Sequence, residues 1–293
     1  MGFDANGVRF LLEAKKSGVL FDDCAMLGRQ NMNLSKAELK YTLAAAGHPC
    51  DSSQLTRILP IEGSTYAENF LEYCGAAKIT SFDNSNYENA SVVHDMNLPI
   101  PAKYYGQYSC LIDGGTLEHV FNYPVALLNC MQMTRVNGHI LFITPCNNYC
   151  GHGFYQFSPE LFYGVFSENN GFSIDKMFVC EVRSFSPWYS VTRPSSLGKR
   201  VMLENSRSTY LLVQAKKISE LQGKGISIQQ SDYVEAWGQS LKSRTENKIN
   251  AKIRSIATSI CGTRLTYRIV DMLRRSRKRL KGRYPAPFYK RYP

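Results

Sequence analysis

The sequence of 293 residues contains no long apolar run. A membrane-spanning helix needs about 18 to 20 consecutive apolar residues, and the longest strongly apolar stretch, residues 140–144, has only the length of a strand. The start of the chain also lacks a basic leader followed by an apolar segment and a small-residue cleavage site. We therefore expect a cytoplasmic protein that is not embedded in a membrane. Hydrophobic residues make up 44% of the chain, enough for one sizeable core.

Acidic residues are missing from the segment 274–293, which carries nine of the 35 Lys and Arg residues. The remaining 26 basic and 24 acidic residues give the body a charge near +2, so the net charge of +11 belongs to this basic tail. Such a tail is typical of a solvated helix end, of a contact with anionic lipid headgroups, or of a contact with nucleic-acid phosphates. Its tyrosines and Phe288, interleaved with prolines, suit an interfacial anchor. We favour a peripheral contact with a membrane or an acidic partner over nucleic acid, because the body is nearly neutral.

The nine cysteines are odd in number, scattered and mostly set in apolar segments. This pattern excludes a disulfide framework and indicates reduced, buried thiols. Cys146, Cys150 and His152 lie close together in the sequence, but their spacing is not typical of a zinc site. We therefore expect no metal.

Predicted strands and helices alternate between residues 65 and 215, which indicates a doubly wound α/β sheet. We expect a domain over 1–218 with an insertion at about 34–63, followed by a helical appendage over 219–293, in which isoleucines at 249, 253, 256 and 260 form one apolar stripe. The expected helices are 4–17, 34–46, 65–74, 124–134 and 158–166. The expected strands are 24–27, 78–82, 91–93, 109–112, 139–144, 173–182 and 209–215.

The most informative segment runs from residue 78 to residue 172. An acidic residue that ends a strand, here Asp83 with Ser85 two residues later, is where doubly wound folds often hold a ribose, because a carboxylate accepts hydrogen bonds from both vicinal hydroxyls. Further motifs follow in order. They are Asp95 to Pro99, Asp113 with Leu117-Glu118-His119-Val120, Arg135-Val136-Asn137-Gly138, Thr144-Pro145, and His152 through Phe157-Ser158-Pro159-Glu160-Leu161 to Gly171-Phe172. Residues 136–139 are expected to form a turn.

In these motifs the sequence resembles the class I S-adenosylmethionine-dependent methyltransferases, particularly the branch related to the quinone-biosynthesis methyltransferases. The resemblance covers about a third of the chain and implies a Rossmann-like fold that binds S-adenosylmethionine. It departs from the family at the first glycine-rich motif, where Ala25 to Gln30 offer one glycine, Gly28, and no acid. That segment also lies 55 residues before Asp83, whereas the family usually places one helix between these points.

The resemblance implies that Asp83 and Ser85 hold the ribose, that Asp95 and Met96 frame the adenine, and that Gly28 lies under the methionine part of the cofactor. Asp113 is a further candidate cofactor residue, although it is equally well explained as a cap of the turn after its strand. The reaction would be in-line transfer of the methyl group to a small-molecule, glycan or lipid-linked acceptor, in which the enzyme mainly aligns the two partners.

An oxygen or nitrogen acceptor must lose a proton, and His119 and His152 are the candidate bases because histidine titrates near neutral pH. Tyr155 and Glu118 are candidates for orienting the acceptor. The alternative function is a non-catalytic binding module of the same fold that has lost its cofactor, and the loop after residue 27 distinguishes the two. An open cleft facing Asp83 favours catalysis, and a cleft filled by Arg29 or Met26 favours the module. A nucleotide-sugar or NAD-dependent enzyme ranks last, since the chain has no G-x-G-x-x-G turn.

Overall fold

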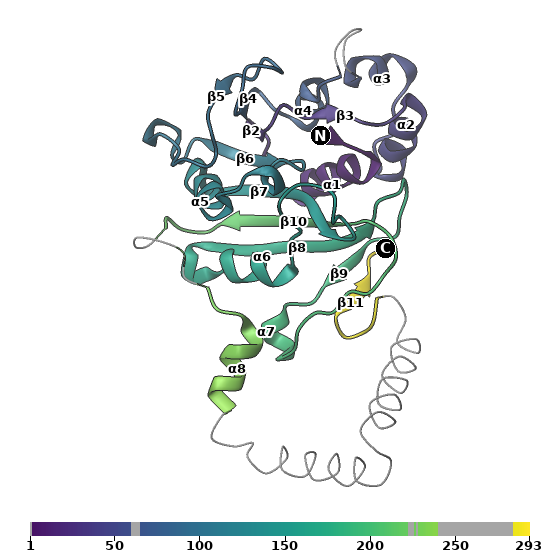
Figure 1. The fold of residues 1–293 in the computed structure, drawn as a ribbon. Coiled ribbons are helices and arrows are strands. Elements are labelled where there is room, and N and C mark those ends of the chain that lie inside the picture. The colour runs from purple at the N-terminus through teal and green to yellow at the C-terminus, as the bar shows by residue number, and fades with distance from the viewer. Residues whose placement is uncertain (1, 60–64, 222–225, 227, 240–283) are drawn as a thin grey trace.

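The computed structural model describes residues 2–59, 65–221, 226, 228–239 and 284–293. Its centre is a nine-stranded sheet with the order β11-β9-β8-β10-β7-β6-β2-β4-β5 (Figure 1). The chain runs through β1 (Gly2–Phe3), α1 (Ala5–Lys16), β2 (Asp23–Leu27), β3 (Asn31–Met32), α2 (Lys36–Ala45), α3 (Ser52–Ile58), α4 (Glu68–Cys74), β4 (Lys78–Asp83), β5 (Val92–Val93), β6 (Tyr108–Asp113), α5 (Tyr123–Met133) and β7 (Thr134–Asn147). It continues through α6 (Pro159–Val165), β8 (Phe172–Glu181), β9 (Tyr189–Val191), α7 (Pro194–Leu197), β10 (Thr209–Lys217), α8 (Ser231–Gln239) and β11 (Tyr289–Arg291).

The strands divide the sheet into a parallel and an antiparallel half. β5, β4, β2, β6 and β7 are parallel, whereas β10 runs antiparallel to both β7 and β8. β4 and β5 follow β2 on one side of the sheet, and β6 pairs with β2 on its other side. The doubly wound α/β sheet that the sequence predicts is thereby confirmed.

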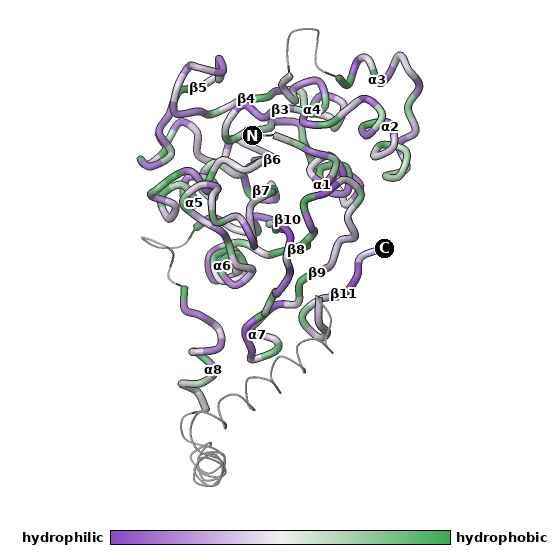
Figure 2. Tube along the Cα trace, turned by 45° about the vertical axis from the view of Figure 1, so that its right-hand side comes forward, coloured by the Kyte–Doolittle hydropathy of each residue, from purple (hydrophilic) through white to green (hydrophobic). Residues whose placement is uncertain are grey.

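Both faces of the sheet are covered by helices, and the alternation of side chains along each strand explains how (Figures 1 and 2). In β2, Ala25 and Leu27 face a cluster that contains residues of α5 and α6, while Cys24 and Met26 face a cluster with residues of α1 to α4. Every residue from 24 to 27 is fully buried. A continuous apolar strand is what a parallel sheet with two covered faces requires.

Polar side chains fix where the helices begin. The Asp4 carboxylate accepts the backbone N–H of Gly7 at 2.9 Å and caps α1. Ser35 with Glu38, and Asp51 with Gln54, form reciprocal capping boxes at α2 and α3. α2 and α3 occupy most of the stretch that we expected to be an insertion.

The turn expected at residues 136–139 is part of a strand. β7 starts at Thr134, directly after α5, and the register against β6 shifts between Tyr108 and Cys110. Asn137 takes a left-handed conformation with φ of 66° within this irregularity. The turn-forming residues therefore produce a bulge, because asparagine tolerates positive φ within a bulge as well as in a turn.

Two short strands, β9 and β11, do not appear among the expected elements. β9 lies between the strands expected at 173–182 and 209–215, and β11 lies in the basic tail, where it forms the edge of the sheet and pairs with β9. Tyr289 is buried and Tyr292 packs against Phe178 and Trp188 at ring distances of 4.7 and 6.4 Å. These two tyrosines therefore pack against the body of the protein, and the expected membrane contact of the tail stays a prediction. The isoleucine stripe and the basic cluster 274–283 lie outside the described residues.

No helix in the described part of the chain is both long enough and apolar enough to cross a membrane. Eight cysteines fall within the same part, and all of them are free thiols.

Substitution of Phe142 in β7 measures how strongly the core between the sheet, α5 and α6 stabilises the fold. It is fully buried and its ring lies 5.0 Å from that of Phe162 and 5.4 Å from that of Phe166. Phe142→Ala should lower the free energy of unfolding by about 3 to 5 kcal/mol, because it leaves a cavity. Tyr87→Ala, at a side chain that is 91% exposed, is the control and should change it by about 0.5 kcal/mol or less. Urea unfolding followed by circular dichroism measures both, and equal losses would contradict the packing described here.

Candidate functional site

The order of the sheet reverses between β2 and β6, and open α/β sheets bind their ligands outside the carboxyl ends of the strands at such a point. Gly28 follows β2 with φ of 65°, and its N–H donates to the carbonyl of Phe82 at 2.7 Å. A Cβ at Gly28 would lie 2.7 Å from Thr116 Oγ1. The glycine therefore lets the loop after β2 approach the loop after β6.

The side chains of Gln30 and Thr116 fill the space between these loops. Gln30 Nε2 donates to the carbonyl of Leu27 at 2.5 Å and to Thr116 Oγ1 at 3.1 Å, and Thr116 Oγ1 donates to the same carbonyl at 2.7 Å. Gln30 Oε1 is buried without a hydrogen-bond partner, and a Cβ at Gly114 would lie 2.6 Å from it. A polar plug thus occupies the crevice at the reversal.

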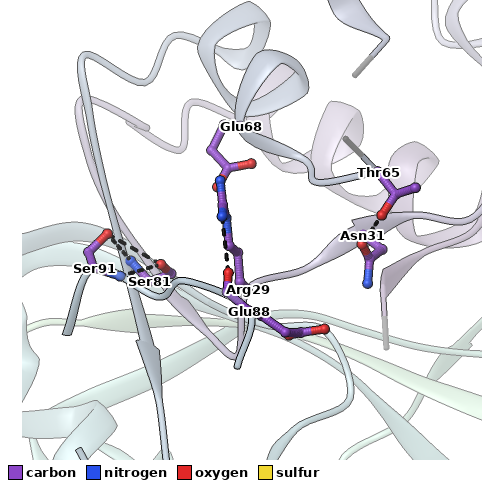
Figure 3. A network of polar contacts seen from close by, with 7 residues as sticks. All are labelled: Arg29, Asn31, Thr65, Glu68, Ser81, Glu88 and Ser91. Carbon is purple, nitrogen blue, oxygen red and sulfur yellow. Dashed lines mark hydrogen bonds and ion pairs between the residues drawn. The ribbon is translucent and has the colours of Figure 1, made fainter. Parts of the chain in front are cut away.

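Arg29 extends from the same loop toward α4 (Figure 3). Its Nε lies 2.6 Å from Glu68 Oε1, its Nη1 donates to the carbonyl of Glu88 at 3.0 Å, and its guanidinium lies 4.0 Å from the centre of the Tyr66 ring. The side chain therefore links the loop after β2 to the start of α4 and to the loop after β4. Met26, the other side chain that we expected might fill the cleft, is buried in the core instead.

The residues expected to hold the cofactor lie at the carboxyl ends of β4, β5 and β6. Asp83 ends β4, and its Oδ1 accepts the N–H of Ser85 at 3.1 Å. Asp95 follows β5, and hydrogen bonds from the backbone and side chain of Asn97 lower the pKa of its carboxyl. Met96 is 5% exposed and packs in the core, so its side chain does not point to a ligand. The assignment of Asp83, Ser85, Asp95 and Met96 to ribose and adenine stays a prediction.

Asp113 has a clear structural role at the end of β6. Its Oδ1 accepts the N–H of Thr116 at 2.8 Å and that of Leu117 at 3.3 Å, which fixes the turn that follows. Its Oδ2 is buried without a partner, and complete burial raises the pKa of this carboxyl to about 6. The turn-capping interpretation is thus the one that the hydrogen bonds support.

Three of the four expected catalytic residues lie together at this end of the sheet. Glu118 Oε1 is 3.5 Å from His152 Nε2, and the rings of His119 and His152 are 4.9 Å apart. Glu118 is 1% exposed, and its Oε2 has no hydrogen-bond partner among the residues that the structure describes. Burial, with the nearby Asp113 carboxyl, raises the pKa of Glu118 to about 8, while burial and the neighbouring His152 lower the pKa of His119.

The loop that carries His152 is docked on Glu118 through the backbone. The carbonyl of Glu118 accepts the N–H of Phe154 at 2.7 Å and that of Tyr155 at 3.3 Å. Gly153 has φ of 72°, and a Cβ there would lie 2.8 Å from the same carbonyl oxygen, so a glycine is required for this approach. The Tyr155 hydroxyl donates to the carbonyl of Phe121 at 2.6 Å, which occupies the donor that we expected to orient an acceptor.

Sequence reasoning did not identify the roles of Gln30, Thr116, Glu68 and Glu88. The available signal was the single glycine in the loop after β2. Because only one residue of that loop lacks a side chain, the side chains of its other residues must pack against neighbouring segments. Gln30 contacts the loop after β6, and Arg29 contacts α4 and the loop after β4.

No protein-family profile and no curated protein matches the sequence. Solved structures that resemble the fold include an S-adenosylmethionine-dependent methyltransferase from Mesorhizobium loti, with 13% identity, a TM-score of 0.38, and coverage of 72% of this chain and 97% of that one. The branched-chain polyamine synthase from Thermus thermophilus has 10% identity and a TM-score of 0.37 over 76% of this chain, and the match spans only 59% of the synthase. A 16S rRNA (adenine(1408)-N(1))-methyltransferase from Catenulisporales acidiphilia has 9% identity and a TM-score of 0.32 over 76% of this chain and 95% of that one. Likeness at these levels assigns neither substrate nor cofactor to this chain.

The raised pKa of Glu118 predicts how stability depends on pH. Between its ordinary value of 4.5 and about 8, the folded protein keeps a proton that the unfolded chain loses, so stability should fall as pH rises through this window. Glu118→Gln removes that proton exchange and should make the decline shallower. Urea unfolding at several pH values, with EDTA present, measures the slope. Glu168→Gln, at an exposed residue near the start of β8, should leave the slope unchanged. Equal slopes for Glu118→Gln and the unmodified chain would contradict the assignment.

Proposed function

We propose that the chain transfers a methyl group from S-adenosylmethionine to a small-molecule, glycan or lipid-linked acceptor. The observation that carries the proposal is the reversal of strand order between β2 and β6. The turn at Gly28 lies beside this reversal, and carboxylates follow β4, β5 and β6 at the same edge of the sheet. This edge is where a doubly wound sheet binds a nucleoside, and the acidic residue at the end of β4 suits its ribose hydroxyls.

The two ends of the cofactor would contact different parts of this edge. Asp83 projects from the end of β4, where its carboxylate would accept hydrogen bonds from the ribose, with Asp95 nearby for the adenine side. Gly28 would lie under the methionine part. Arg29 links the loops around this place through Glu68 and the carbonyl of Glu88, so it must release at least one of these contacts for a ligand to enter.

Glu118, His119 and His152 would receive the acceptor. The reaction needs an in-line approach to the methyl group, and a docked loop that fixes His152 against Glu118 restricts the positions an acceptor can take. The acceptor's proton would leave on this side, where two imidazoles lie together. The basic segment 274–283 would hold a membrane-linked acceptor or an acidic partner nearby, which is a separate proposal based on its charge alone.

One observation favours a second candidate function, a binding module of the same fold without a cofactor. The side chains of Gln30 and Thr116 fill the space between the loops after β2 and β6, and Arg29 links the loop after β2 to Glu68. Catalysis calls for an open crevice between these loops. Cofactor binding separates the two functions.

Calorimetric titration with S-adenosylmethionine and S-adenosylhomocysteine should give micromolar binding that Asp83→Asn weakens by about tenfold or more. The asparagine keeps the oxygen that accepts the Ser85 N–H but removes the charge, and hydrogen bonds to a charged group are worth about 1.5 to 3 kcal/mol. Glu168→Gln removes the same charge far from the site and should leave the affinity unchanged. Equal affinities for Asp83→Asn and the unmodified chain would place the ribose elsewhere.

Arg29→Ala should bind S-adenosylmethionine more tightly than the unmodified chain, by roughly tenfold or less, because the cofactor no longer has to displace the contacts with Glu68 and Glu88. Arg57→Ala removes an exposed guanidinium from α3 and serves as the matched control. If neither the unmodified chain nor Arg29→Ala shows heat or thermal stabilisation at millimolar ligand, the binding module is the correct function.

A further inference from the structure

Glu118, His119 and His152 place three potential metal ligands in one small volume. One carboxylate oxygen and one nitrogen from each imidazole lie within 4.8 Å of one another, and the Glu118 oxygen is already 3.5 Å from His152 Nε2. Two ligands at about 2.1 Å from one ion are at most about 4.2 Å apart. In tetrahedral geometry the same bond lengths place ligand atoms about 3.4 Å apart, so side-chain movements of about 1.4 Å or less bring all three to bonding distance.

Within the described residues, one oxygen of the Glu118 carboxylate has no hydrogen-bond partner. Its side chain is 2% exposed, and Oε2 is buried without a hydrogen bond. A buried carboxylate without a donor is costly, and a cation beside it removes that cost. The two imidazoles lie on its solvent side, with His119 exposed and His152 half-buried.

The backbone holds the two ligand-bearing segments together in advance. The N–H groups of Phe154 and Tyr155 donate to the carbonyl of Glu118, and the N–H of His152 donates to the carbonyl of Tyr149 at 2.9 Å. Gly153 permits this close approach. Residues 118–119 and 152 therefore meet through hydrogen bonds that do not involve the ligand atoms.

From this geometry we infer that Glu118, His119 and His152 bind one first-row divalent metal ion such as Zn²⁺. Two imidazole nitrogens and one carboxylate oxygen suit Zn²⁺, Co²⁺, Fe²⁺ or Mn²⁺, whereas Mg²⁺ and Ca²⁺ prefer oxygen ligands alone. The inference replaces our expectation of a chain without a metal. It also differs from a site made of Cys146, Cys150 and His152, because it uses neither thiol.

Three protein ligands with an exposed side are the arrangement of a site that keeps a position open. If the proposed methyl transfer is correct, an acceptor hydroxyl would bind at that position and the ion would lower its pKa. His119 and His152 would then act as ligands and not as bases. Metal binding itself does not depend on the proposed function.

The test uses the full-length chain, stripped with EDTA and titrated without S-adenosylmethionine. Zn²⁺ should bind by calorimetry with one ion per chain, and Co²⁺ should produce the visible absorption of an ion in a nitrogen and oxygen site. Mg²⁺ should do neither. His119→Asn and His152→Asn should each weaken Zn²⁺ binding by at least about tenfold and lower the Co²⁺ absorption. Both side chains are partly exposed, so the metal-free variants should melt with the unmodified chain.

Two control variants test whether the loss of Zn²⁺ binding is specific to His119 and His152. Cys150→Ser removes the exposed thiol two residues from His152, and His94→Asn removes an imidazole near the end of β5. Both should bind Zn²⁺ as the unmodified chain does. The inference is overturned if no Zn²⁺ or Co²⁺ binds at millimolar concentration, if Mg²⁺ binds as well as Zn²⁺, or if binding survives His119→Asn combined with His152→Asn. Asp83→Asn tests S-adenosylmethionine binding separately, so the absence of Zn²⁺ binding would not contradict the proposed function, and the absence of cofactor binding would not contradict the metal site.

Discussion

The parallel pairing of β2 with β6 is the interaction on which the other features of this molecule depend. Both strands are buried on both faces, so neither can shift register without exposing one set of apolar side chains to the wrong layer. Because the two strands are parallel, the loops that follow them lie side by side at one edge of the sheet. The polar plug, the turn capped by Asp113 and the docked His152 loop are all built on that edge. The positions of Gly28, Asp113 and Glu118 thus follow from one pair of strands.

The polar groups at this edge differ in how completely they are hydrogen-bonded beside β2 and beside β6. Gln30 and Thr116 share a carbonyl, and Arg29 pairs with Glu68, so most polar groups beside β2 have partners. Beside β6, Asp113, Glu118 and Tyr123 each bury an oxygen without a partner. Natural proteins leave few such groups, and each calls for an explanation. The contrast supports the proposal that the acceptor binds on the β6 side.

Most of the sheet could be predicted from the sequence because its central strands are apolar and bounded by turn residues. The strands at 24–27, 78–82 and 109–112 are examples. β9 and β11 could not be found, since each is only three residues long, and β11 is paired with a strand about 100 residues away. The bulge at Asn137 was read as a turn because local residue preference does not reveal what a neighbouring strand imposes.

The candidate site, like the sheet, could be predicted from the sequence only in part. His119 and His152 were chosen for their titration range, and the structure places them together with Glu118. The unpaired oxygen of Glu118 and the hydroxyl bond of Tyr155 depend on tertiary contacts that spacing cannot show. Arg29 stood out in the sequence only as a residue beside a lone glycine, whereas its contacts reach residues up to 59 positions away.

The pairing of β11 with β9 decides which strand forms one edge of the sheet. β9 lies between β8 and β11, so its backbone N–H and C=O groups are covered on both sides. Without β11, β9 would present an open row of these groups, and an open strand edge can pair with a strand of another chain. β11 therefore protects β9 from pairing with another chain.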